Sequence, residues 1–105
     1  MHMSTLETVG AYVTAWNNRE LENLMALFTE NAVMSSPMGP QKGKAQIRSQ
    51  SSMFLAMTAK NKMTDPYEEN GAVRAKIKAP VGTVTLTFTV AGGLIDRIDA
   101  KMGLR

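Results

Sequence analysis

The sequence predicts an α+β domain in which a curved antiparallel sheet carries three N-terminal helices on one of its faces. Three observations lead to this class. Before residue 58, apolar residues recur at three- and four-residue steps, the period of amphipathic helices. From residue 62 onward they alternate with polar residues, the period of strands that face a core on one side. This order, helices followed by a meander of strands, is typical of a sheet with its helices gathered on one face.

The first helix is predicted to begin after Ser4. The segment Ser4-Thr5-Leu6-Glu7 has the form of a capping box, in which the Ser4 hydroxyl accepts the amide proton of Glu7 and the Glu7 carboxylate reaches back to Ser4. One face of this helix carries an apolar stripe that includes two large aromatic residues. The stripe consists of Leu6, Val9, Tyr12, Val13 and Trp16.

Two further helices and a short strand are predicted to follow. Asn17 and Asn18 are expected to end the first helix and to cap the second. Residues 32–36 favour a short strand, which the Pro-Met-Gly-Pro loop closes. The third helix is predicted over residues 44–57, directly after Gly43. The inner sides of the second and third helices carry Leu21, Leu24, Met25 and Phe28, and Ile47, Ser51, Phe54 and Leu55, respectively.

The strands after residue 62 are predicted from alternation. A weak strand over residues 63–67 is followed by a turn at residues 68–71. The next two strands form a hairpin in which we expect Ala79 to lie opposite Val84. In this register every apolar residue faces an apolar one, and every cation faces a threonine.

A three-residue turn at Ala91-Gly92-Gly93 is predicted to lead into the last strand, residues 94–102. This turn places five residues on the inner face, namely Leu94, Asp96, Ile98, Ala100 and Met102. A two-residue turn would instead place three ionised residues there, Arg97, Asp99 and Lys101. The three-residue turn is favoured because it avoids that desolvation cost, and it places Val84 opposite Ala100.

Length and composition exclude several classes of function. With 105 residues the chain is expected to form one domain, residues 1–105. It contains no cysteine and its single histidine is His2, so we expect no metal site, no cofactor and no Ser-His-Asp triad. The 12 basic residues are not clustered, so we expect no nucleic-acid binding. No apolar run approaches ~20 residues, and the N-terminus lacks a signal-peptide pattern, so we expect a cytoplasmic protein that does not bind a membrane.

The stretch AYVTAWNNRELENLMALFTENAVMSSPMG, residues 11–39, and the following GKAQIRS carry several short motifs. They are Tyr-Val-x-Ala-x-Asn, Leu-x-x-Leu-x-Ala-Leu-Phe, Pro-x-Gly and Gly-x-x-x-Ile-Arg. With these motifs the chain resembles the ketosteroid isomerase-like, or SnoaL-like, branch of the nuclear transport factor 2-like superfamily over most of residues 9–103. The resemblance implies a cystatin-like cone, in which a bent sheet wraps around an apolar pocket and the helices close its narrow end.

The same resemblance locates the positions of the isomerase machinery. The isomerases hold a tyrosine on the first helix, a general-base aspartate at the end of the first strand, and a protonated aspartic acid on a later strand. Carried over to this chain, these positions fall on Tyr12, on Ser36 and near Val84. A serine without a histidine or lysine partner stays protonated, and a valine donates no hydrogen bond. The resemblance therefore implies the fold and pocket without the carboxylates needed for isomerisation.

Asp96 is a further candidate for chemistry. On the predicted inner face beside Phe88, apolar surroundings would raise the pKa of this carboxyl and suit it to act as an acid or base. Polyketide cyclases and epoxide hydrolases of the superfamily resemble this arrangement in using a carboxylate from a late strand. The alternative is that the strand twists at its start, so that Asp96 points into solvent or pairs with a cation such as Arg97 or Arg74.

The sequence leaves three hypotheses of function. The first is a dimeric protein that binds a small apolar molecule without isomerase chemistry. The second is an isomerase, cyclase or hydrolase that acts on a steroid-like or cyclic metabolite through Asp96 and Tyr12. The third is a dimeric association module whose pocket is vestigial. The predicted ligand-binding residues are Trp16, Met34, Ser36, Phe54, Val84, Leu86, Phe88, Ile98 and Ala100; for Tyr12 and Trp16 the alternative is a purely structural role in the core.

The outer face of the predicted hairpin is polar. Arg74, Lys76 and Lys78 alternate along one strand, and a row of threonines follows the other. We expect a homodimer to form through this face, because so small a domain gains stability by burying surface against a second copy. The alternative is a solvated face.

Overall fold

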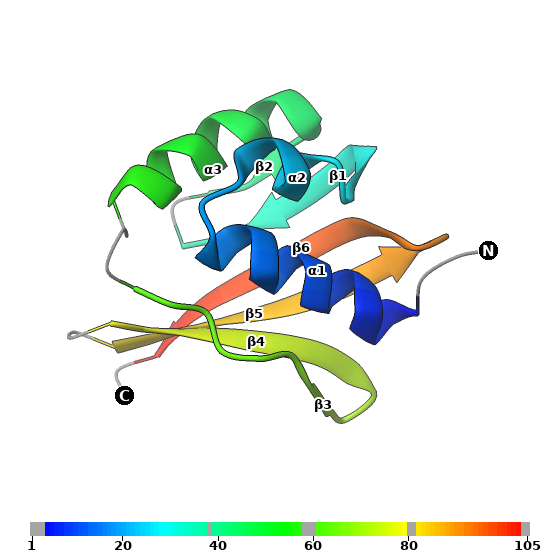
Figure 1. Ribbon diagram of the computed structural model, residues 1–105, viewed down its shortest axis with the longest axis vertical. Coiled ribbons are helices and arrows are strands. Elements are labelled where there is room, and N and C mark those ends of the chain that lie inside the picture. Colours follow the sequence, from blue (N-terminus) through cyan, green and yellow to red (C-terminus); the bar gives the residue numbers. More distant parts are fainter. Residues whose placement is uncertain (1–3, 38, 58–60, 80–81, 104–105) are drawn as a thin grey trace.

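The computed structural model of the chain describes residues 4–37, 39–57, 61–79 and 82–103. Its helices are α1 (Thr5–Asn17), α2 (Leu21–Met25) and α3 (Lys44–Met57). Its strands are β1 (Phe28–Ser35), β2 (Gln41–Lys42), β3 (Tyr67–Glu69), β4 (Ala72–Ala79), β5 (Gly82–Ala91) and β6 (Leu94–Gly103). The strands form a curved, unclosed sheet in the order β2-β1-β6-β5-β4-β3, with the helices on one of its faces (Figure 1). The predicted α+β class is confirmed.

The helices cover different parts of the sheet. α1 contacts β4, β5 and β6, whereas α3 contacts β1 and β2 (Figure 1). The sheet is antiparallel except where β1 runs parallel to β6, with Met34 opposite Ile98. The predicted sheet was antiparallel throughout, so the parallel pairing of β1 with β6 differs from the prediction. Parallel neighbours need a long crossover, which α3 and the intervening strands supply here.

The predicted boundaries are confirmed for the start of α1 and for α3. At the start of α1, the backbone N–H of Glu7 donates to Ser4 Oγ over 3.1 Å, and the backbone N–H of Ser4 donates to Glu7 Oε1 over 2.8 Å. The capping box is therefore complete. α3 extends from Lys44 to Met57, as the apolar period predicts. In the described ranges of the chain, no helix is both long and apolar enough to cross a membrane.

The predicted end of the second helix is wrong. α2 ends at Met25, and Phe28 is the first residue of β1, four residues before the strand predicted from residue 32. The cause is a long-range contact, because the backbone N–H of Ile95 donates to the carbonyl of Leu27 over 2.7 Å. This hydrogen bond draws the segment into the sheet although its apolar residues keep a helical period.

Asn17 ties α1 to the segment that follows α3. Its side-chain amide donates to the carbonyl of Met63 over 3.0 Å and accepts from the N–H of Met63 over 2.7 Å. Asn18 ends α1, as predicted, but α2 is capped by neither asparagine, because Glu20 precedes it without a side-chain cap. The prediction that Asn17 and Asn18 cap the second helix is therefore wrong.

The β4–β5 hairpin is confirmed, but its predicted register is wrong by two residues. Ile77, rather than Ala79, lies opposite Val84. A shift of two keeps every side chain on its predicted face, because the side-chain period of a strand is two. The preceding strand also lies later than predicted, since β3 begins at Tyr67 and the Asn-Gly pair alone forms its turn. Both turn residues have positive φ, 53° at Asn70 and 79° at Gly71, as a two-residue hairpin turn requires.

The start of β6 corrects the predicted inner face. The turn contains two residues, Gly92 and Gly93, and Ala91 pairs with Leu94. A β-bulge then adds one residue to β6, so that Val90 pairs with Ile95 and Thr89 pairs with Arg97. Ile95 therefore faces the core in place of Leu94 and Asp96, whereas Ile98, Ala100 and Met102 keep their predicted face. The bulge also places Met102, rather than Ala100, opposite Val84.

The core lies between the helices and the inner face of the sheet. Its largest fully buried side chains are Phe28, Leu24, Ile47, Ile95, Ile98, Val9 and Thr8. The Thr8 hydroxyl donates to the carbonyl of Gly93 over 2.9 Å, which ties α1 to the β5–β6 turn. The Tyr12 ring packs edge-to-face against Phe28 and Phe88, with centroid distances of 5.9 and 5.2 Å. This aromatic cluster fills the interior next to the candidate site.

Candidate functional site

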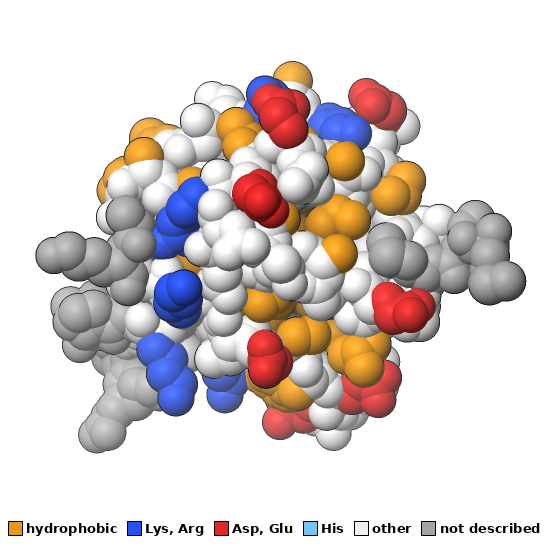
Figure 2. Space-filling model, viewed as in Figure 1, with side chains coloured by type: hydrophobic (Ala, Val, Ile, Leu, Met, Phe, Trp, Pro, Cys, Tyr) orange, Lys and Arg blue, Asp and Glu red, His pale blue; other side chains and the backbone are white. Residues whose placement is uncertain are grey.

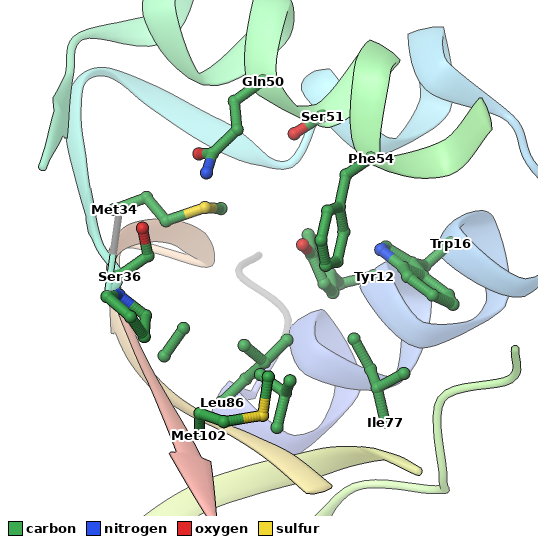
Figure 3. Close-up of a pocket in the computed structure, with 13 residues that line it drawn as sticks. Tyr12, Trp16, Met34, Ser36, Gln50, Ser51, Phe54, Ile77, Leu86 and Met102 are labelled. Carbon is green, nitrogen blue, oxygen red and sulfur yellow. The ribbon is translucent and has the colours of Figure 1, made fainter. Parts of the chain in front are cut away.

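A cavity of about 170 Å³ lies between α1, α3 and the inner face of the sheet (Figure 3). Side chains from both helices and from four strands of the sheet converge on it. The lining consists of Tyr12, Trp16, Met34, Ser36, Pro37, Gln50, Ser51, Phe54, Ile77, Val84, Leu86, Ala100 and Met102. Most of these side chains are apolar, and the few polar side-chain groups are three hydroxyls, one amide and the indole N–H of Trp16.

Most of the predicted ligand-binding residues meet at this cavity. They are Trp16, Met34, Ser36, Phe54, Val84, Leu86 and Ala100, and the predicted hydrogen-bond donor Tyr12 joins them. Phe88 and Ile98 belong to the core instead. They lie opposite each other on β5 and β6, one step nearer the turn, where the rings of Tyr12 and Phe28 fill the interior.

Asp96 lies outside the cavity, contrary to the prediction that it faces the inner side. It is the extra residue of the β6 bulge, and its side chain is exposed. Its Oδ1 accepts a hydrogen bond from the Thr29 hydroxyl over 2.9 Å. The cations proposed as alternative partners bind elsewhere, since Arg97 pairs with Asp99 and Arg74 pairs with Glu69. Asp96 therefore does not line the cavity.

Sequence reasoning missed five lining residues, namely Pro37, Gln50, Ser51, Ile77 and Met102. Ile77 and Met102 were predicted on the inner face of the sheet, and Ser51 on the inner side of the third helix, but none of them was assigned to the site. Gln50 stands four residues before Phe54, and residues at this spacing share a helix face. The four-residue spacing therefore places Gln50 on the same helix face as Phe54. Because its amide is polar, however, Gln50 does not belong to the apolar pattern that identifies the inner side of a helix.

Tyr12 presents its hydroxyl to the cavity (Figure 3). Its side chain is 2% exposed. Burial raises the pKa of Tyr12 well above its ordinary value of 10.0, so the group stays protonated and remains a donor at neutral pH. Trp16 lies one turn further along α1, and its ring packs against Phe54 at 6.4 Å.

Ser36, onto which the resemblance carries the general-base position, directly follows β1. Its hydroxyl donates to the carbonyl of Gly39 over 3.1 Å and also reaches the cavity wall. Ser36 therefore both satisfies the loop backbone and lines the cavity. Val84, near which the resemblance places the oxyanion acid, contributes apolar surface to the cavity lining.

Charged groups stay on the surface of the molecule. None of the described residues that line the cavity is Asp, Glu, Lys, Arg or His. Figure 2 shows Lys and Arg side chains along one side of the visible face and at its top, and carboxylates at the top and over the rest of that face. Within the described ranges, no cluster of three or more His, Cys, Asp or Glu side chains is placed to hold a metal ion.

Replacing Tyr12 with phenylalanine should make the protein less sensitive to alkaline pH. Above pH ~10 the unfolded chain releases the Tyr12 proton while the folded chain keeps it, so the raised pKa lowers the free energy of unfolding as the pH rises. Between about pH 9 and about pH 11 this contribution is ~1.4 kcal/mol, and Tyr12→Phe removes it. Urea unfolding of both proteins at the two pH values measures the difference. Identical losses in both proteins would show that the Tyr12 hydroxyl titrates as it does in water.

The curved, open sheet with helices over one face and a hollow between them defines the class of cystatin-like folds. Residues 9–98 match the model of the SnoaL-like domain, and the chain belongs to this family. The predicted membership of the SnoaL-like branch of the nuclear transport factor 2-like superfamily is thus confirmed. No curated protein matches the sequence.

Solved structures share the fold at low sequence identity. A SnoaL-like protein of unknown function from Burkholderia thailandensis is 16% identical, with a TM-score of 0.78 and coverage of 96% of this chain and 98% of that one. A putative polyketide cyclase from Sinorhizobium meliloti is 20% identical, with a TM-score of 0.75 and coverage of 90% and 94%, respectively. At these identities the likeness concerns the fold alone.

Proposed function

We propose that the protein binds a small, uncharged and largely apolar molecule in the cavity between α1, α3 and the sheet, without isomerase chemistry. One observation carries this proposal: about 170 Å³ of interior space is left open inside a lining of apolar and neutral polar side chains.

The space is partly open to solvent and is not filled by neighbouring side chains. Met34 and Met102 line the hollow with flexible side chains that fill irregular gaps well, yet they leave it open. This argues against the vestigial pocket of the third hypothesis.

The enzymatic alternative has no carboxyl group among the described residues that line the cavity. Tyr12 lines the cavity, but Asp96 is exposed on the β6 bulge and Ser36 replaces the general base. Proton abstraction next to a carbonyl needs a base within hydrogen-bond reach of its substrate. Among the described lining residues none has a suitable pKa near neutrality, so binding without proton transfer is the better account of this site.

The homodimer through the outer sheet face stays a proposal. The helices lie on the other face of the sheet (Figure 1), and the threonines of β5 and the cations of β4 are half-buried or exposed in the single chain. Two such faces would bring Lys76 and Lys78 near equivalent cations, so their association should strengthen as salt screens the charges. Light scattering across a range of salt concentrations tests this dimer.

Ligand titrations should locate binding in the cavity. Trp16 is the only tryptophan of the chain and lines the hollow, so its fluorescence should change in a saturable way when toluene or phenol is added. In methyl spectra of ¹³C-labelled methionine, the signals of Met34 and Met102 should shift. The signal of Met57, whose side chain is 74% exposed on α3, should not.

Two variants sharpen this test. Ala100→Phe places a ring in the hollow and should weaken binding of both probes at least about tenfold, because the added side chain occupies their volume. Asp96→Asn changes the same strand outside the cavity and should leave binding unchanged. The proposal fails if neither probe gives a saturable signal, or if Ala100→Phe binds as tightly as the parent protein.

A further inference from the structure

A second hollow lies on the outer face of the sheet, away from the helices. It is a groove of about 320 Å³ that crosses four neighbouring strands, β3, β4, β5 and β6. Its lining consists of Tyr67, Glu69, Arg74, Lys76, Thr85, Thr87, Lys101, Met102 and Gly103. The groove contains charged side chains, unlike the cavity under the helices, and the proposed binding of an apolar molecule gives it no role.

The groove carries an excess of positive charge. Three of its lining residues are cations and one is a carboxylate, so three minus one leaves a net charge of +2. The carboxylate, Glu69, pairs with Arg74. Lys76 and Lys101 form no ion pair with any residue that the structure describes. Two ammonium charges in the groove are therefore not neutralised.

Strand pairing places these two lysines on either side of one threonine. Thr85 lies opposite Lys76 on β4 and opposite Lys101 on β6. Lys76 and Thr85 alternate along their strands with residues buried in the core, so their side chains point to the outer face. Neighbouring strands lie ~4.8 Å apart, so the two lysine backbones stand roughly 10 Å apart. The flexible four-carbon stem of each lysine is long enough to bring both ammonium groups over the threonine hydroxyl.

The other polar groups of the groove already have partners. Arg74 pairs with Glu69, and its Nε donates to the Thr87 hydroxyl over 3.1 Å. The Lys76 ammonium lies 5.6 Å from the centroid of the Tyr67 ring. A cation–π contact at a partly exposed site is weak, so it does not hold this ammonium against a charged ligand. Arg74 is thus a fixed part of the wall, whereas the two lysines are available to a ligand.

The charge and the donors of the groove suit an oxyanion with two negative charges. Ammonium and hydroxyl groups both donate hydrogen bonds, and bonds from an ammonium group to phosphate oxygens are charge-assisted. A phosphate dianion supplies several acceptor oxygens to Lys76, Thr85 and Lys101 and balances the net charge of +2. A carboxylate ligand supplies one charge and two oxygens, so it leaves part of the site unsatisfied.

Carboxylates limit the cationic region to the length of a small ligand. Glu69 lies within the groove, and Asp99 lies two residues from Lys101 on the same face of β6, opposite Thr87. A long polyanion that followed the strands would meet both acidic groups, and like charges at close range repel. The arrangement therefore favours a single phosphate group over the repeated phosphates of a nucleic acid.

We propose that the outer groove binds the dianionic phosphate group of a small molecule. The ammonium groups of Lys76 and Lys101 hold the phosphate from two sides, and the Thr85 hydroxyl donates a third hydrogen bond. This site is separate from the cavity, so the inference does not rest on the proposed binding of an apolar molecule. The groove belongs to the face proposed for the homodimer, and binding is therefore measured at protein concentrations at which light scattering gives the mass of one chain.

Methyl phosphate is a suitable probe because it has no apolar body that could enter the cavity. At pH 8 it is a dianion, since the second pKa of a phosphate monoester is about 6. Titration into ¹⁵N-labelled protein at a constant ionic strength of ~0.15 M should shift the amide signals of Lys76, Thr85 and Lys101 in a saturable way. Acetate, a monoanion, should bind at least about tenfold more weakly.

Substitutions locate the site. Lys76→Gln and Lys101→Gln should each raise the Kd of methyl phosphate about tenfold, because each removes a charge-assisted hydrogen bond. Lys42→Gln is the matched control. Lys42 is exposed on β2, at the opposite edge of the sheet, so this variant has the same net charge with the groove intact. Its Kd should equal that of the parent protein.

The outcomes distinguish a built site from general attraction to a basic protein. A saturable signal that Lys76→Gln and Lys101→Gln weaken and Lys42→Gln does not supports the phosphate site. The inference is overturned if methyl phosphate gives no saturable signal, or if Lys42→Gln weakens binding as much as the two groove variants. It is also overturned if a short RNA oligonucleotide binds more tightly than methyl phosphate at an equal concentration of phosphate groups, because the surface then binds polyanions. The cavity proposal stands or falls separately, by the apolar probes.

Discussion

Replacing Ile95 with aspartate should abolish the folded state, whereas replacing the adjacent Asp96 with alanine should cost at most about 1.5 kcal/mol. Ile95 is 0% exposed, and a buried, unpaired carboxylate is among the most destabilising changes a core can receive. Its cost is of the order of the ~5–15 kcal/mol that stabilises a whole domain. Asp96 is exposed and contributes one hydrogen bond with Thr29. Circular dichroism and urea unfolding measure both effects.

This pair of variants tests the phase with which β6 begins after the two-residue turn. With the predicted three-residue turn, Asp96 would face the core and Ile95 would face solvent, so the two effects would exchange places. If Ile95→Asp gives no soluble protein, Ile95→Ala provides a measurable substitute with an expected loss of about 2–5 kcal/mol in the free energy of unfolding. A loss below that of Asp96→Ala would contradict the observed phase of β6.

Truncating Phe28 to alanine should lower the free energy of unfolding by about 3–5 kcal/mol. Phe28 is 2% exposed and packs edge-to-face against the Tyr12 ring, so its removal leaves a void at the centre of the aromatic cluster. Leu6→Ala is the matched control, because Leu6 belongs to the predicted stripe of α1 and yet is 43% exposed. Its loss should stay below about 1 kcal/mol. Urea unfolding at neutral pH compares the two variants.

An effect of Phe28→Ala no larger than that of Leu6→Ala would mean that this residue lies outside the core. The contrast between the two positions also separates periodicity from burial. Both were predicted on apolar helical stripes. Phe28 is buried as the first residue of a strand. Leu6 lies in the first turn of α1 and is partly exposed, because the sheet packs against the middle of this helix.

The candidate site was predictable in part because its residues follow local periods. Tyr12 and Trp16 share a helical stripe, and Val84, Leu86 and Ala100 alternate with polar residues along strands. Their faces therefore followed from spacing. No apolar period marks Gln50. Its place in the cavity lining depends on a hollow that forms only when α3, α1 and the sheet come together.

Local chemistry accounts for what the amino-acid sequence determined by itself: the capping box at Ser4 and Glu7, the extent of α3, the faces of the β4–β5 hairpin and the family motifs. Each depends on residues that are neighbours along the chain, where backbone and side-chain preferences act directly. Tertiary structure alone decided where α2 ends, how β6 is phased and which polar groups meet in the cavity. These features depend on contacts between distant segments, such as Ile95 with Leu27 and Asp96 with Thr29, whose free energies outweigh the small local preferences that periodicity reports.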